Sequence, residues 1–130
     1  MSEIEAILSP AFLLKLVAIE TIKQYSTIDT SIKNEGLQNK VELKVMLIEP
    51  SSDESELNEN IYEIILKDVT SYQIDFLNPD DRTFEFDTDE VKLERESKSE
   101  GMYILSFINA SVEIYIKFSG VEVKLLTGKK

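Results

Sequence analysis

The sequence contains no cysteine and no histidine among its 130 residues. Without cysteine, no disulfide stabilises the fold and no thiolate acts as a nucleophile, which agrees with a reducing compartment. Without histidine, the chain lacks the most common general base at neutral pH, and the usual nitrogen and sulfur ligands of zinc are missing too. These absences exclude a serine–histidine triad and a zinc hydrolase.

Glycine and long apolar runs are also scarce. The four glycines stand alone at positions 36, 101, 120 and 128, so the chain has no glycine-rich phosphate loop. No uncharged apolar run is long enough to span a bilayer, and the first residues lack the pattern of a secretory signal peptide. We therefore expect a soluble, cytoplasmic, non-enzymatic protein with no catalytic residue, no metal site and no cofactor.

Charge of one sign dominates what is present. The formal net charge is −11, and residues 49–63 contain six acids and no base. An acidic chain lacks the attraction to phosphate groups that nucleic acids and anionic membranes require. The composition therefore predicts neither of these as a partner. It is compatible with a basic protein partner, or with nothing more than good solubility.

The most regular part of the chain lies near its carboxyl end. Residues 112–118 alternate apolar and polar side chains, which is typical of a strand with one buried face. After Ser119 and Gly120 the apolar positions change parity, to 121, 123 and 125. We favour a two-residue hairpin here, with Gly120 at positive φ, Phe118 opposite Val121 and Lys117 opposite Glu122. The alternative is a β-bulge at Gly120 within one long strand.

A second change of parity occurs at Lys67 and Asp68, between apolar runs that together cover 61–76. The residues before it, 63–67 (EIILK), resemble residues 113–117 (EIYIK), which precede the first one. Two related hairpin units within one pair of sheets would explain this echo, and coincidence among short strands would explain it equally well. The segment 61–76 is accordingly one long strand or two strands joined at Lys67 and Asp68.

Further strands are predicted at 16–25, 41–48, 83–86, 91–96 and 102–108, and Ser9 followed by Pro10 indicates a short helix over 10–14. Strands about ten residues apart, with turns between them, indicate a mainly β fold. We predict a single domain over 1–130, an antiparallel β-sandwich or flattened barrel with one short N-terminal helix. Residues 1–8 are a turn of helix or disordered, and 127–130 are disordered.

The candidate contact surface is acidic. Residues 49–60, EPSSDESELNEN, are predicted to form a mobile loop, and a mobile loop of one charge can steer a basic partner to its interface. The residues assigned to partner binding are Asp53, Glu54, Glu56 and Glu59.

At the level of pattern, the second half resembles small bacterial immunity proteins that neutralise toxins. The features that carry the resemblance are residues 64–69, the strand at 91–96 and the terminal sheet with Tyr103, Phe118 and Val121. It implies a binder that blocks a toxin by occluding its active site, and it includes no motif from which functional residues could be transferred. Two other hypotheses are a self-associating structural or accessory β-domain, and a sandwich that binds calcium or a glycan at its loop end.

Overall fold

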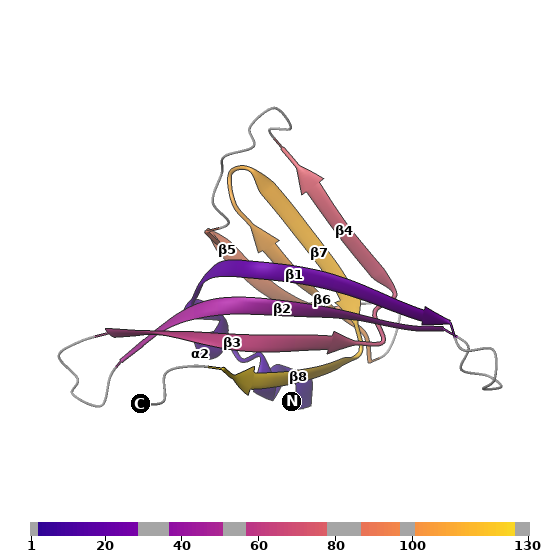
Figure 1. Cartoon of the computed structure of the whole chain (residues 1–130), viewed down its shortest axis with the longest axis horizontal. Helices are drawn as coiled ribbons and strands as arrows, with labels where there is room; N and C mark the ends of the chain where they lie inside the picture. The colour runs from indigo at the N-terminus through magenta and orange to yellow at the C-terminus, as the bar shows by residue number, and fades with distance from the viewer. Residues whose placement is uncertain (1–2, 29–36, 51–56, 78–86, 97–100, 127–130) are drawn as a thin grey trace.

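The computed structural model describes residues 3–28, 37–50, 57–77, 87–96 and 101–126 (Figure 1). Its elements, in chain order, are α1 (Glu3–Ile7), α2 (Pro10–Leu14), β1 (Leu16–Ile28), β2 (Leu37–Pro50), β3 (Leu57–Lys67), β4 (Ser71–Phe76), β5 (Glu90–Arg95), β6 (Tyr103–Ile108), β7 (Val112–Phe118) and β8 (Gly120–Leu125). The predicted segments 83–86 and 127–130 lie outside the described residues. Residues 3–7, for which helix and disorder were both open, form helix α1.

The strands form two antiparallel sheets, which confirms the predicted mainly β fold. Sheet A has the order β1-β2-β3-β8, and sheet B has the order β4-β7-β6-β5. The two sheets lie on either side of a common core, as in a β-sandwich, and their strands run in clearly different directions (Figure 1). The helix predicted after Ser9 and Pro10 is confirmed as α2, with α1 directly before it.

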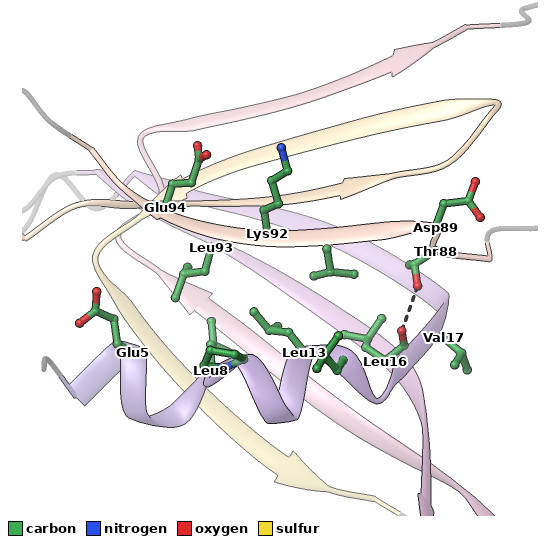
Figure 2. Close-up of a pocket in the computed structure, with 13 residues that line it drawn as sticks. Glu5, Leu8, Leu13, Leu16, Val17, Thr88, Asp89, Lys92, Leu93 and Glu94 are labelled. Carbon is green, nitrogen blue, oxygen red and sulfur yellow. Dashed lines mark hydrogen bonds between the residues drawn. The ribbon is translucent and has the colours of Figure 1, made fainter.

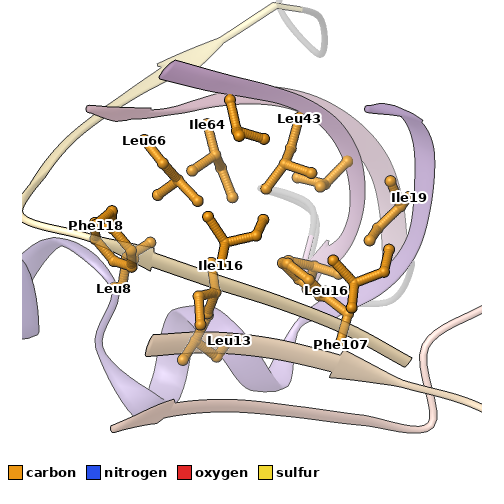
Figure 3. Packing of buried hydrophobic residues seen from close by; sticks show 14 of the residues in the cluster. Leu8, Leu13, Leu16, Ile19, Leu43, Ile64, Leu66, Phe107, Ile116 and Phe118 are labelled. Atoms are coloured by element: carbon orange, nitrogen blue, oxygen red, sulfur yellow. The ribbon is translucent and has the colours of Figure 1, made fainter. Parts of the chain in front are cut away.

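The period-two pattern produces the core. Over residues 41–47 of β2 and throughout β7, every second residue is fully buried, and these residues are Val41, Leu43, Val45, Leu47, Val112, Ile114, Ile116 and Phe118. Leu43, Ile64 and Leu66 of sheet A point toward Phe107, Ile116 and Phe118 of sheet B (Figure 3). Because burial of each large apolar side chain contributes roughly 1.5–3 kcal/mol, this interface is the main source of stability.

The change of parity at Gly120 is not a hairpin, so that prediction was wrong. Strand β7 belongs to sheet B, whereas β8 pairs with β3 in sheet A, which sets Val121 opposite Leu66 instead of Phe118. Among the described glycines, positive φ occurs at Gly101 and not at Gly120. The alternative, a β-bulge within one long strand, agrees with the structure in that the chain does not turn back on itself at Gly120. It differs in that β7 and β8 are separate strands in different sheets. The extra residue is taken up where the chain changes sheet, so both strands keep apolar residues toward the core.

Strand β3 changes sheet at the same place, where it is followed by β4 in sheet B. The Ser119 N–H donates to the Lys67 carbonyl at 3.1 Å, and the Thr70 N–H donates to the Lys117 carbonyl at 2.9 Å. We call residues 67–70 and 117–120 the crossover corner. The repeated EIILK and EIYIK segments therefore do not mark two hairpin units, since β3 pairs with β8 and β4 pairs with β7.

Candidate functional site

The acidic residues assigned to partner binding are only partly described by the structure. Asp53, Glu54 and Glu56 lie outside the described residues, so their role stays a prediction. Glu59 was placed in a loop, but it lies in β3, opposite Ile48 of β2. The β2–β3 ladder continues to the pair Pro50 and Leu57, so residues 49, 50 and 57–60 are strand residues. Glu59 is exposed on this ladder.

Glu49, at the other end of the predicted loop, is an inward-facing strand residue that anchors α2. Its carboxylate accepts hydrogen bonds from Asn60 Nδ2 at 2.7 Å and from the Tyr62 hydroxyl at 3.0 Å, and Lys15 Nζ lies 3.6 Å away. Burial acts to raise the pKa of Glu49, but the two hydrogen bonds and the charge of Lys15 outweigh it and lower that pKa. The same burial and the neighbouring carboxylate raise the pKa of Tyr62. The carboxylate is thus held charged by partners that already occupy it.

Helix α2 is fixed by its own first turn and by this anchor. The Ser9 hydroxyl accepts from the Phe12 N–H at 3.2 Å, which caps the helix, and the Phe12 ring meets the Tyr62 ring edge-on at 5.6 Å. Leu13 is buried on the core side, whereas Leu14 is 84% exposed. Such exposure is unusual for a leucine in a helix whose apolar face is covered. Leu14 lies beside a cavity.

The cavity runs between the α1–α2 segment and strand β5, and its volume is about 840 Å³. Figure 2 shows Leu8 and Leu13 of the helical segment, and Leu16 at the start of β1, on the side of the cavity that faces β5, where Leu93 points toward the helical segment. Val91 and Leu14 also line the cavity. Binding cavities for organic ligands and chain segments span about 300–1,000 Å³ and are mostly apolar. We call this cavity the β5 groove.

The β5 groove is bounded at each end by a polar contact between its two walls. At one end Arg95 forms a two-pronged ion pair with Glu5 of α1, with nitrogen–oxygen distances of 2.8 and 2.9 Å. At the other end the Thr88 hydroxyl donates to the Leu16 carbonyl at 3.0 Å, and the Thr88 N–H donates to the Val17 carbonyl at 3.0 Å. These contacts keep the helical segment alongside β5 without filling the space between them.

One wall of the groove is the outer edge of β5. In sheet B this strand pairs with β6 alone among the described strands. The Glu96 N–H donates to the Met102 carbonyl, so by antiparallel alternation the backbone groups of Glu94 and Lys92 point to β6. Those of Val91 and Leu93 point into the groove. Both odd- and even-numbered residues of β5 line the cavity, as expected when the cavity runs along the edge of the strand and not along one of its faces.

The rim of the groove carries an excess of acid. Its charged lining residues are Glu5, Asp89, Lys92 and Glu94. Glu5 is paired with Arg95, and Lys92 lies 3.4 Å from Glu90. Among the described residues, no ion pair involves Asp89 or Glu94. Two acidic groups therefore stand uncompensated beside an apolar floor and an open strand edge.

The groove offers an apolar binding surface with acidic side chains at its rim. Within the described ranges, no three or more acidic side chains gather in a way that could hold a metal ion. In the same part of the chain, no helix combines the length and apolar character needed to cross a membrane.

Sequence reasoning missed this groove, although it placed the strand at 91–96 almost correctly. The edge position of β5 and the course of α2 along it depend on long-range pairing, which local periodicity does not encode. The one usable local signal was Leu14, a leucine at the end of a five-residue helix too short to bury all of its apolar residues.

No protein-family model matches the chain, and comparisons with curated proteins and with solved structures found no similar protein. Function must therefore be argued from the groove itself.

Proposed function

We propose that this chain is a non-enzymatic protein-binding domain that holds a segment of another protein in the β5 groove. The observation that carries the proposal is the groove's construction: an apolar floor, an open strand edge and two uncompensated acids at the rim. Protein-binding sites combine an apolar centre with a polar rim in this way. The acidic net charge favours a basic partner.

An inhibitor of the immunity type is the form of this function that the sequence resemblance implies. Such a protein acts stoichiometrically, by covering the active site of a basic target in a bacterial cytoplasm. The predicted acidic residues Asp53, Glu54 and Glu56 would then contribute long-range attraction, and the groove would contribute the close contact. Attraction of this kind raises the association rate more than it slows dissociation.

The second candidate is self-association of a structural β-domain through an exposed strand edge. It is supported by β4, the other edge of sheet B, where Phe76 is 57% exposed and Leu77 is 46% exposed. Two copies that each carry a net charge of −11 repel one another, which weighs against this alternative at low salt.

A matched pair of surface variants separates the candidates. Leu14→Ser removes an exposed leucine beside the groove, and Leu77→Ser makes the same change at the far edge of sheet B. The wild-type protein and both variants are immobilised, and proteins captured from host lysate at low salt are quantified by mass spectrometry. We expect a basic protein that wild type and Leu77→Ser retain and Leu14→Ser loses.

Equal capture by all three proteins would contradict a role for the groove. Sedimentation of the same proteins tests the second candidate. An oligomer that persists in high salt and dissociates in Leu77→Ser would favour self-association through β4.

A further inference from the structure

We infer that the occupant of the β5 groove is an extended chain segment that adds to β5 as a fifth strand of sheet B and alternates apolar with basic side chains. The inference rests on the proposed function and specifies its partner's chemistry. It follows from the backbone of β5, from the length of the groove and from the two environments on either side of the strand.

The backbone edge decides between a chain segment and a small apolar molecule. The N–H and C=O groups of Val91 and Leu93 point into the groove, because those of Lys92 and Glu94 are directed to β6. A small apolar molecule in the cavity would remove water from these groups and replace no hydrogen bond, which is costly. An extended segment supplies a donor and an acceptor at every second residue, as in other cases of strand addition.

The length of the groove fits a short segment. Its polar ends are Thr88 and Arg95, and strand β5 (Glu90–Arg95) makes up six residues of the stretch between them. At about 3.3 Å per residue, β5 is roughly 20 Å long, which is room for about five to seven residues. The partner's contribution is therefore a single strand, not a hairpin or a helix.

The two faces of the added strand meet different surroundings. Side chains of a strand alternate between faces, so one set would lie on the floor formed by Leu13, Leu16 and Leu93. The other set would lie on the outer face of sheet B, where Lys92 and Glu94 point away from the helical segment (Figure 2). Since Lys92 is paired with Glu90, the uncompensated charges there belong to Glu94 and Asp89. Basic side chains complement them.

A second copy of this chain fits less well than a basic partner. Apart from the repulsion between two acidic molecules, an added strand from this protein would have to come from its own edges. The edge strand β4 (SYQIDF) carries Asp75 and no basic residue, and in each of the other edge strands, β1, β5 and β8, acidic and basic residues are equal in number. None of these strands has the net positive charge that would compensate the acid at the rim.

The test uses a synthetic heptapeptide that alternates lysine and valine, Lys-Val-Lys-Val-Lys-Val-Lys, and follows its binding by fluorescence anisotropy at low and high salt. Controls are a block peptide of the same composition and an alternating glutamate–valine peptide. We expect the alternating lysine–valine peptide to bind at least about tenfold more tightly than either control, since both the pattern and the charge must match. Leu14→Ser should weaken this binding, and Leu77→Ser should not.

Two further peptides carry N-methyl groups either on all valines or on all lysines. One set of amides faces β5 and the other faces away, so one N-methylated peptide should lose about tenfold or more in affinity while the other stays within about twofold. Loss with the valine set indicates an antiparallel added strand, and loss with the lysine set a parallel one. Equal effects of the two sets would overturn strand addition.

The outcomes distinguish this inference from the proposed function. If a lysate protein is captured in a Leu14-dependent manner but peptide binding ignores the methylation pattern, the groove binds protein without strand addition and the inference alone fails. If neither the lysate protein nor the peptide depends on Leu14, both fail. A dimer that Leu14→Ser dissociates would place a second copy in the groove and would also overturn the inference.

Discussion

The two places where sheet A meets sheet B are closed in different ways. At the crossover corner the backbone itself passes between the sheets twice, and the crossing segments are hydrogen-bonded to each other through Lys67 and Ser119. At the β5 groove, separate elements approach one another and are joined by side-chain contacts, such as the ion pair of Arg95 with Glu5, and by the backbone hydrogen bond from the Thr88 N–H to the Val17 carbonyl. The first closure leaves fully buried residues, including Leu66 and Phe118, and the second leaves a cavity.

This difference indicates how the molecule divides stability from binding. At the crossover corner, the two crossing segments hydrogen-bond to each other and need no further partner. At the groove, β5 ends its sheet, and a strand that ends a sheet retains unpaired backbone groups. This open edge of β5 lies beside an apolar cavity. We therefore expect changes at the crossover corner to act on folding, and changes at the groove to act mainly on binding.

The largest expected effect is at the crossover corner. Phe118 is fully buried at the end of β7, where its ring lies 6.3 Å from that of Tyr103. Phe118→Ala should lower the free energy of unfolding by about 3–5 kcal/mol, because it removes a large side chain and leaves a cavity. Urea denaturation measures this change. Phe76→Ala, at a residue 57% exposed, is the control and should cost about 1 kcal/mol or less.

The anchor of α2 is expected to depend on pH. The pKa of Glu49 is lowered in the folded protein, so its charged form stabilises the fold above the ordinary carboxyl pKa, and this contribution is lost as the pH falls through the lowered value. Glu49→Gln should cost about 1–3 kcal/mol near neutral pH. The difference from wild type should shrink when urea denaturation is repeated in acid.

A matched change at exposed Glu59, Glu59→Gln, should alter the unfolding free energy by about 0.5 kcal/mol or less. If Glu49→Gln cost no more than this control at neutral pH, Glu49 would not anchor α2.

A smaller effect is expected where β3 leaves sheet A. Asp68 has φ of 54°, in the left-handed region that β-branched residues avoid. Asp68→Val should therefore destabilise the protein by about 1–2 kcal/mol, whereas Asp68→Gly should be nearly neutral because glycine adopts this conformation without strain. Thermal unfolding followed by circular dichroism compares the two. Equal losses would mean that the carboxylate, and not the backbone conformation, matters at this position.

The smallest expected effect on folding is at the groove. Thr88→Val keeps the shape of the side chain but removes the hydrogen bond to the Leu16 carbonyl, and it should cost about 0.5–1.5 kcal/mol in urea denaturation. The backbone bond from the Thr88 N–H to Val17 remains. A loss as large as that of Phe118→Ala would show that the groove is part of the stabilising core, against the division proposed above.

The elements of this fold could largely be predicted from sequence, because burial on one face imposes a period of two. The strand at 112–118 and the helix after Ser9 follow from local patterns alone. The partner of β8 could not be predicted, since Ser119 and Gly120 permit a hairpin and only the distant β3 decides otherwise. Glu59 was misplaced for a similar reason, because an acidic, turn-rich composition hid the continuation of the β2–β3 ladder.

The candidate site was less accessible to sequence reasoning than the fold. Charge drew attention to residues 49–60, where the described acid that matters most, Glu49, turns out to be an internal anchor. The groove depends on which strand ends sheet B and on how α2 lies beside it. Neither follows from the residues of β5 or α2 taken separately.

The most direct test of the central claim is amide hydrogen exchange along β5, measured by NMR in the free protein and with the alternating lysine–valine peptide bound. We predict that the amides of Lys92 and Glu94 are protected throughout, because they are bonded to β6. The amides of Val91 and Leu93 should exchange rapidly in the free protein and become protected in the complex. Protection of Val91 and Leu93 in the free monomer, or no change when the peptide binds, would contradict an open edge that accepts a strand.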